Sequence, residues 1–166
     1  MNPDDKIYHV LFICTRNSAR SIMAEGMLNH LGRGRFRAWS AGSYPAGEVQ
    51  SLALATLADM NLPTAGYRSK DWNEFATPKA PHMDFVLTVC DKAACEACPT
   101  WPGQPMSAHW GVADPAEATG DEAERAKAFR DAASVLRRRI ELMLSLPLDA
   151  LDTLSLQREI QGIGKQ

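Results

Sequence analysis

Stretches of consecutive apolar residues alternate along the chain with stretches in which apolar residues recur every three or four positions. Residues 7–13 form a nearly continuous apolar run, which favours a parallel strand buried on both faces. Behind it, Met23, Met27 and Leu31 follow one another at a four-residue step, which predicts a helix up to about His30. The chain therefore opens with a strand, a short loop and a helix.

The same alternation continues to the end of the chain. It predicts further strands over residues 36–40, 85–89 and 106–110, with residues 41–43 leaving the second strand in a turn. It predicts helices over residues 49–60 and 121–146, and a short helix in the tail over 149–160. The alternation of strands and helices predicts an α/β fold with an open, parallel four-stranded sheet flanked by helices. The length fits a single domain over residues 1–166.

Three chemically active side chains fall just past predicted strands. Cys14 follows the first strand, Cys90 follows the strand over 85–89, and Asp114 comes shortly after the last. In open parallel sheets, ligands bind beyond the carboxyl ends of the strands. We therefore expect these three side chains to meet at one edge of the sheet.

The segment behind the first strand, residues 14–21, reads Cys-Thr-Arg-Asn-Ser-Ala-Arg-Ser. A cysteine and an arginine separated by five residues, between a strand and a helix, form a cradle for a tetrahedral oxyanion. Arg20 can bind two oxygens at once through its planar guanidinium. Ser21 can donate a hydrogen bond to the sulfur or to a departing group. The same dipoles favour the thiolate of Cys14, a nucleophile. The expected oxyanion-binding residues are Thr15, Arg16, Asn17, Ser18, Ala19 and Arg20.

Charge and composition exclude several other classes of protein. The 18 lysines and arginines nearly balance the 20 aspartates and glutamates, and they are scattered, which argues against a nucleic-acid surface. The arginine triplet 137–139 is expected to spread around a solvated helix face. The first residues lack the apolar core of a signal peptide, and no apolar run is long enough to cross a membrane. These features predict a cytoplasmic protein whose four cysteines are kept reduced.

Together these motifs resemble a known family. The Cys-x5-Arg-Ser motif of residues 14–21, continued by Met-Ala-Glu-Gly at 23–26, looks like the thiol-dependent arsenate reductases built on the low-molecular-weight protein tyrosine phosphatase fold. Those reductases carry two further redox cysteines, the second followed by proline, and Cys90 and Cys98 match that pattern. The Asp-Pro step at Asp114 also matches. The resemblance covers nearly the whole chain.

The resemblance implies a disulfide cascade. Cys14 attacks arsenate, Cys90 attacks Cys14 and releases arsenite, and Cys98 then attacks Cys90. Asp114 matches the acid that protonates the leaving oxygen in the phosphatases. The Cys90–Cys98 disulfide would be reduced by an external thiol system, thioredoxin or glutaredoxin with glutathione. No bound cofactor is implied, phosphate and sulfate would act as substrate analogues, and nothing requires more than a monomer.

Two alternatives remain open at this point. A tyrosine phosphatase of the same fold shares the cradle, but such enzymes usually place aromatic residues after the Asp-Pro acid, and here residues 116–118 read Ala-Glu-Ala. A thiol or zinc sensor is the other alternative, with Cys90, Cys95, Cys98 and His109 as possible zinc ligands. The family pattern does not require Cys95, which we expect to be a bystander.

One further set of residues bears on metal binding. Asn17, Glu25 and Ser40 match positions that bind potassium in some relatives, but the carboxylate that completes that site falls at Lys70 here. A lysine ammonium can replace the charge of the ion, so we predict no bound metal. Asn17 is also expected to hold the strained backbone of the cradle, because asparagine tolerates unusual dihedral angles.

Overall fold

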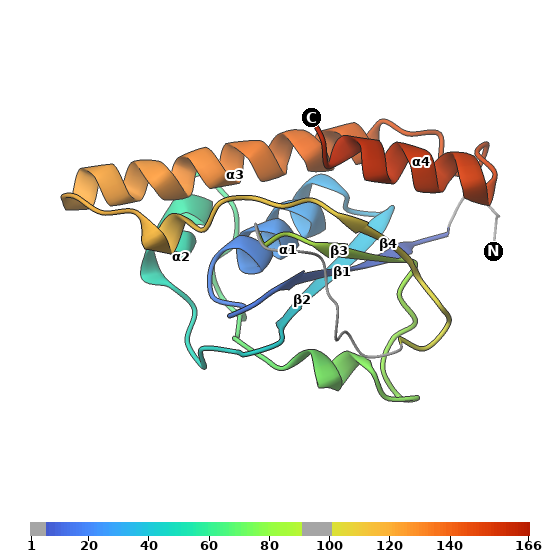
Figure 1. The fold of residues 1–166 in the computed structure, drawn as a ribbon, viewed down its shortest axis with the longest axis horizontal. Coiled ribbons are helices and arrows are strands. Elements are labelled where there is room, and N and C mark those ends of the chain that lie inside the picture. Colours follow the sequence, from blue (N-terminus) through green and yellow to red (C-terminus); the bar gives the residue numbers. More distant parts are fainter. Residues whose placement is uncertain (1–5, 91–100) are drawn as a thin grey trace.

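The structure is a computed structural model that describes residues 6–90 and 101–166. Its centre is a sheet of four parallel strands in the order β2-β1-β3-β4 (Figure 1). The strands are β1 (Tyr8–Cys14), β2 (Phe36–Gly42), β3 (Phe85–Thr88) and β4 (Met106–His109). The predicted four-stranded parallel α/β fold is thus confirmed. Cys95 and Cys98 lie outside the described residues.

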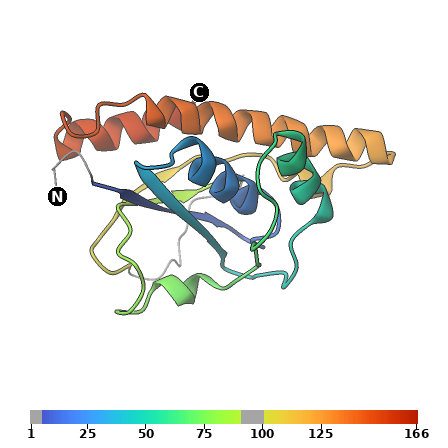
Figure 2. The same ribbon diagram turned by 180° about the vertical axis from the view of Figure 1, so that it is seen from behind.

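The four α-helices gather on one side of the sheet. They are α1 (Arg20–Leu31), α2 (Ser51–Asp59), α3 (Glu122–Leu144) and α4 (Thr153–Ile163). The long helix α3 lies outermost, over α1, while the short 3-10 helix η2 (Trp72–Phe75) covers the opposite face (Figures 1 and 2). Among the described residues, no helix has the length and apolar character needed to span a membrane.

The core explains why the first strand is apolar throughout. Val10 and Phe12 are fully buried on the face covered by the helices, while Leu11 and Ile13 are buried on the face covered by η2. Successive side chains of a strand point to opposite faces, so a strand covered on both sides needs apolar residues at every position. This burial fixes β1 as a central strand and places Cys14 at its carboxyl end.

Several predicted boundaries were wrong by a few residues. The second strand does not turn away at residues 41–43 but continues to Gly42, because Gly42 pairs with Cys14 in β1 and bridges to Asp71 on its other side. Helix α3 begins after Asp121, whose side chain accepts the N–H of Glu124 at 2.8 Å. A side-chain cap of this kind sets where a helix starts.

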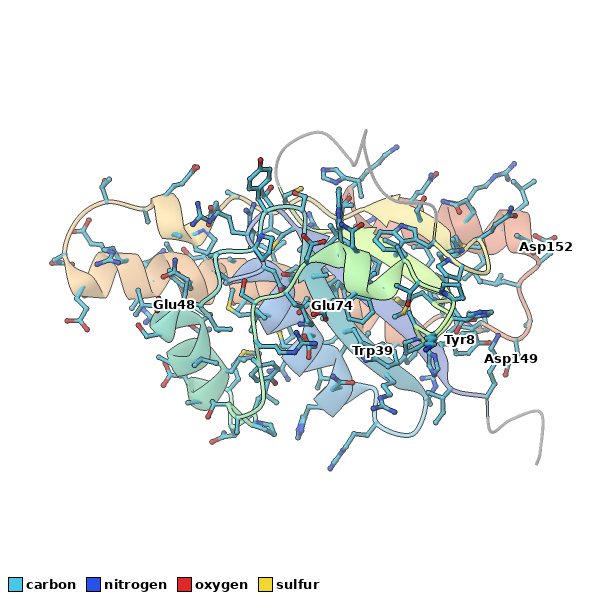
Figure 3. The ribbon with its side chains drawn as sticks, turned by 90° about the horizontal axis from the view of Figure 1, so that it is seen from below. Tyr8, Trp39, Glu48, Glu74, Asp149 and Asp152 are labelled. Atoms are coloured by element: carbon cyan, nitrogen blue, oxygen red, sulfur yellow. The ribbon has the colours of Figure 1, made fainter. Side chains whose placement is uncertain are left out.

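The tail helix was predicted four residues too early. It begins at Thr153 because Asp152 caps it, accepting the N–H of Ser155 at 2.7 Å. Asp149 lies before the helix and accepts a 2.7 Å hydrogen bond from the Tyr8 hydroxyl (Figure 3). Burial, followed by this hydrogen bond, raises the pKa of Tyr8 to about 12. The hydrogen bond ties the start of β1 to the turn ahead of α4.

Helix α4 covers the end of the edge strand β4. The indole N–H of Trp110, which is fully buried, donates to the carbonyl of Ile160 at 2.9 Å. Gly164 packs directly against the Trp110 ring and the His109 carbonyl. The last turn of the chain therefore lies beside the segment that leaves β4 towards the predicted acid.

Candidate active site

The strand β1 delivers Cys14 to a buried position beside the first turn of α1. Its side chain is 2% exposed, and its sulfur lies 2.9 Å from the hydroxyl oxygen of Ser21. That hydroxyl oxygen accepts a 2.8 Å hydrogen bond from the side-chain amide of Asn17, so its own hydrogen is available for the sulfur. A hydroxyl donor stabilises a thiolate more than a thiol. The contact fits the nucleophilic role that the sequence predicts for Cys14.

Asn17 holds the loop in a conformation that few residues adopt. Its φ of 48° lies in the left-handed region, which asparagine tolerates better than most other residues. Its side-chain oxygen accepts the backbone N–H of Lys70 at 2.9 Å, while its side-chain nitrogen donates to Ser21. Both ends of this buried amide are used, so the expected structural role of Asn17 fits its contacts.

The carbonyl groups of the loop are turned away from its centre. Those of Thr15, Arg16 and Ser18 accept backbone N–H groups of the segment 44–50 at 2.8–2.9 Å. We infer that the N–H groups of the same loop face the enclosed side. The N-terminus of α1 has no side-chain cap and no acidic residue in its first turn, which keeps it open to an anion. The loop therefore has the polarity of an oxyanion site.

Arg20 joins this loop to the predicted acid. The guanidinium is 5% exposed and donates to the carbonyl of Val112 at 2.9 Å. Its other terminal nitrogen lies 3.6 Å from a carboxylate oxygen of Asp114. Asp114 accepts the N–H of Ala116 at 3.0 Å and caps the short 3-10 helix η3 (Pro115–Glu117). The structure thus brings Cys14, Arg20 and Asp114 to one edge of the sheet.

Beneath the loop, a buried cluster contains the lysine that occupies the potassium-site position. The Lys70 ammonium lies 3.4 Å from the Ser40 hydroxyl and 3.9 Å from a carboxylate oxygen of Glu25, and it donates to the Arg68 carbonyl at 3.0 Å. Burial raises the pKa of Glu25, against the Ser40 hydrogen bond and the Lys70 charge. Burial lowers the pKa of Lys70, opposed by Glu25 and, more weakly, by Cys14. The lysine thus supplies a positive charge next to the cradle.

Cys90 lies half-buried, two residues past the end of β3. It packs against the same apolar cluster that contains Cys14. A side chain at Gly111 would lie 2.9 Å from the Cys90 carbonyl oxygen and 2.7 Å from the His109 ring. Only glycine therefore lets the segment leading to Asp114 approach Cys90 this closely.

His109 and Cys90 are the two candidate zinc ligands that lie in the described residues. A ring nitrogen of His109 lies 2.7 Å from the hydroxyl of Thr88, its register partner on β3. The zinc alternative also needs Cys95 and Cys98, which lie outside the described part of the chain. The place of Cys98, the predicted last thiol of the cascade, is therefore not described.

Two features of the site were missed from the sequence. The segment 44–50, which supplies the N–H groups for the loop, carries no side-chain motif that would reveal it. Arg139 was placed wrongly on a solvated face: its guanidinium is 7% exposed and contacts the backbone ahead of Asp114, whereas Arg137 and Arg138 are exposed as predicted. Its spacing of three residues from Leu136 on the apolar stripe was a signal that could have found it.

Comparison with known proteins identifies the family. The family of low molecular weight phosphotyrosine protein phosphatases matches residues 9–158, so the chain belongs to this family. Within it, an arsenate reductase of Shouchella clausii is 33% identical over 73% of this chain and 84% of its own length. A solved arsenate reductase in its phosphate binding state superposes with a TM-score of 0.64 at 25% identity, covering 81% of this chain and 95% of the other. The predicted resemblance to arsenate reductases is confirmed.

Two further relatives carry the name of a reductant. A glutaredoxin arsenate reductase of Synechocystis is 27% identical over 82% of this chain and 95% of its own length. A thioredoxin-dependent arsenate reductase of Corynebacterium glutamicum has a TM-score of 0.54 at 25% identity, covering 82% of this chain and 63% of the other.

Proposed function

We propose that this chain reduces arsenate to arsenite, with Cys14 as the nucleophile. The observation that carries the proposal is a buried cysteine beside Ser21 at the start of an anion cradle, with a second cysteine, Cys90, just past the neighbouring strand and against the same apolar cluster. A phosphatase needs only the first of these thiols. A reductase needs both, because the second thiol removes the first from the substrate.

In the first step the Cys14 thiolate attacks arsenic and an oxygen leaves. The Arg20 guanidinium and the N–H groups of the loop hold the remaining oxygens, which keeps arsenic in line with the sulfur. Asp114, 3.6 Å from Arg20, protonates the departing oxygen, which then leaves as water or hydroxide. One sulfur–arsenic bond forms and one arsenic–oxygen bond breaks.

In the second step the Cys90 thiolate attacks the sulfur of Cys14. A disulfide forms between the two cysteines, and the electron pair of the sulfur–arsenic bond stays on arsenic. Arsenic passes from the +5 to the +3 state and leaves as arsenite. A phosphate adduct has no comparable reduction available and waits for water. The second thiol therefore separates the substrates that the cradle alone cannot distinguish.

The cascade then needs an external reductant. Cys98 attacks Cys90, and the resulting Cys90–Cys98 disulfide is reduced by a dithiol protein, for which thioredoxin or glutaredoxin is proposed. The names of the Synechocystis and Corynebacterium relatives support both possibilities. A reducing compartment, the cytoplasm, supplies such partners. No bound cofactor enters any step.

The test is arsenate reduction coupled in turn to thioredoxin and to glutaredoxin with glutathione. Cys90→Ser should abolish arsenite formation, at least about a thousandfold, because the proposed cascade assigns the release of arsenic from Cys14 to the Cys90 thiol. Cys95→Ser is the matched control and should retain activity. Wild-type protein that forms no arsenite with either reductant would overturn the proposal.

Phosphate ester hydrolysis is the second candidate activity, because the matched family carries the phosphatase description. The chemistry of the first step is shared, so p-nitrophenyl phosphate should be hydrolysed slowly. Cys90→Ser should leave this hydrolysis intact while arsenite formation is lost. An equal loss of both activities would contradict the division of roles between Cys14 and Cys90.

A further inference from the structure

Arg139 is a buried cation in the C-terminal part of the long helix α3. One terminal nitrogen of its guanidinium donates to two successive carbonyls, that of Trp110 at 2.8 Å and that of Gly111 at 2.9 Å. The next carbonyl along the chain, that of Val112, accepts from Arg20. The guanidinium groups of Arg139 and Arg20 therefore bind three consecutive carbonyls, those of residues 110–112, just before Asp114.

The N–H groups of the same segment are bound to β3 and the residue after it. The N–H of Trp110 donates to the Thr88 carbonyl at 2.7 Å, and that of Val112 donates to the Val89 carbonyl at 3.0 Å. The segment thus continues the pairing of β4 past its end, but none of the described strands lies on its outer side. Buried carbonyls must find donors, and here Arg139 supplies those that a neighbouring strand would supply elsewhere.

Packing alone does not explain an arginine at this position. Its neighbours on the buried face of α3 are apolar, among them Leu136, Ile140 and Met143. Arg139 forms no ion pair with any carboxylate of the described residues, and its Nε atom is buried without a hydrogen-bond partner. Burying a charge under these conditions is costly, so an apolar side chain would be the cheaper core residue. The retained cation must act through the carbonyls that it binds.

We infer that Arg139 is a positioning residue that holds the loop carrying Asp114 at its working distance from Arg20. The inference deepens the proposed reduction of arsenate and rests on it. The Trp110 and Gly111 carbonyls anchor one end of the loop to α3, and the Val112 carbonyl anchors the other to the cradle. Without Arg139 the Trp110 and Gly111 carbonyls lose their donor, the outer side of the segment keeps only the Arg20 contact, and Asp114 is held less firmly beside the leaving oxygen.

The experiment compares Arg139→Met with Arg138→Met in the full chain. Arg138 is the adjacent residue of the same triplet and is exposed, so its variant controls for loss of charge on α3. Arg139→Met should slow single-turnover arsenite formation about tenfold, as expected for a displaced catalytic group. Phosphate affinity, measured by calorimetry, should stay within about twofold, because the cradle does not contact Arg139. Arg138→Met should change neither.

A double-mutant cycle with Asp114→Asn decides whether Arg139 acts through the acid. In the Asp114→Asn background, Arg139→Met should slow the reaction by less than about twofold, because there is no acid left to position. The same tenfold loss in both backgrounds, or an equal loss of phosphate affinity, would overturn the inference while wild type remains active. Wild type that forms no arsenite would overturn the proposed function and the inference with it. If Arg139→Met does not fold, Arg139→Lys, which keeps one charged donor, enters the same cycle.

Discussion

Two loops meet at the site, and they are held in opposite ways. The loop behind β1 is fastened through its backbone, because the segment 44–50 donates N–H groups to three of its carbonyls. The segment behind β4 is fastened on its outer side by side chains, those of Arg20 and Arg139. The carbonyls of the first loop therefore have backbone donors, whereas those of the second depend on the side chains of two residues distant in sequence.

The two loops also share one requirement. Each needs a glycine at a close contact. Gly42 lies against the cradle, and Gly111, in the segment behind β4, lies against Cys90. At Gly42 the close atoms belong to the backbone of Thr15 and Asn17, which cannot move without deforming the cradle. At Gly111 the close atoms are the His109 ring and the carbonyl oxygen of Cys90, neither of which belongs to the cradle. A side chain at Gly42 would therefore deform the cradle itself, whereas one at Gly111 would displace the segment beside Cys90.

Among changes to the two loops, we expect the largest effect from Asp114, the predicted acid at the end of the segment behind β4. Asp114→Asn should slow the first chemical step about a hundredfold, because an amide cannot protonate the leaving oxygen. Phosphate affinity should not fall, since a negative charge near the anion has been removed. Quenched-flow measurement of the Cys14–arsenic step tests this, with the exposed helix cap Asp121→Asn as control. Equal rates in the wild type and in Asp114→Asn would remove Asp114 from the mechanism.

A smaller effect should separate the two glycines. In Gly42→Ala the new methyl group lies 2.6 Å from the Thr15 carbonyl, so the cradle must open and phosphate affinity should fall about tenfold. In Gly111→Ala phosphate affinity should be kept, and the attack by Cys90 should slow instead. Calorimetry and single-turnover arsenite release distinguish the two variants. Equal losses of phosphate affinity in Gly42→Ala and Gly111→Ala would contradict this difference between the two glycines.

The smallest effect concerns the cation beneath the cradle. Lys70→Met leaves the Glu25 carboxylate without its positive neighbour and should lower the free energy of unfolding by about 1 kcal/mol at neutral pH. Burial already raises the pKa of Glu25 above 4.5, and loss of Lys70 raises it further. The deficit should therefore grow as the pH rises above 4.5 and vanish in acid, where Glu25 is protonated in both proteins. Urea unfolding across this pH range, with the exposed Lys127→Met as control, provides the measurement; a deficit independent of pH would contradict it.

Much of the cradle could be predicted from the sequence because its determinants are local. The strand, the loop and the helix follow one another within residues 7–31, and the roles of Cys14, Arg20 and Asn17 depend on neighbours a few positions away. The parallel sheet was equally readable, since β1 and β3 are apolar throughout and parallel strands end at one edge.

The contacts that could not be predicted join residues far apart in the chain. Val112 and Arg20 are 92 positions apart, and Trp110 and Arg139 are 29 apart. Arg139 turns inward because it lies three residues past the buried Leu136 and directly before the buried Ile140, on the buried stripe of α3. The sequence pattern alone does not show that the carbonyls of Trp110 and Gly111 face away from the described strands and accept hydrogen bonds from Arg139.

The contact between the last turn of the chain and Trp110 has a practical consequence. An affinity tag fused behind Gln166 would start three residues beyond Gly164, which lies against the Trp110 ring. Trp110 opens the segment that leads to Asp114, so a bulky fusion there crowds the working edge of the enzyme. The start of β1 lies at the opposite edge of the sheet (Figure 1). Purification handles therefore belong ahead of the first residue.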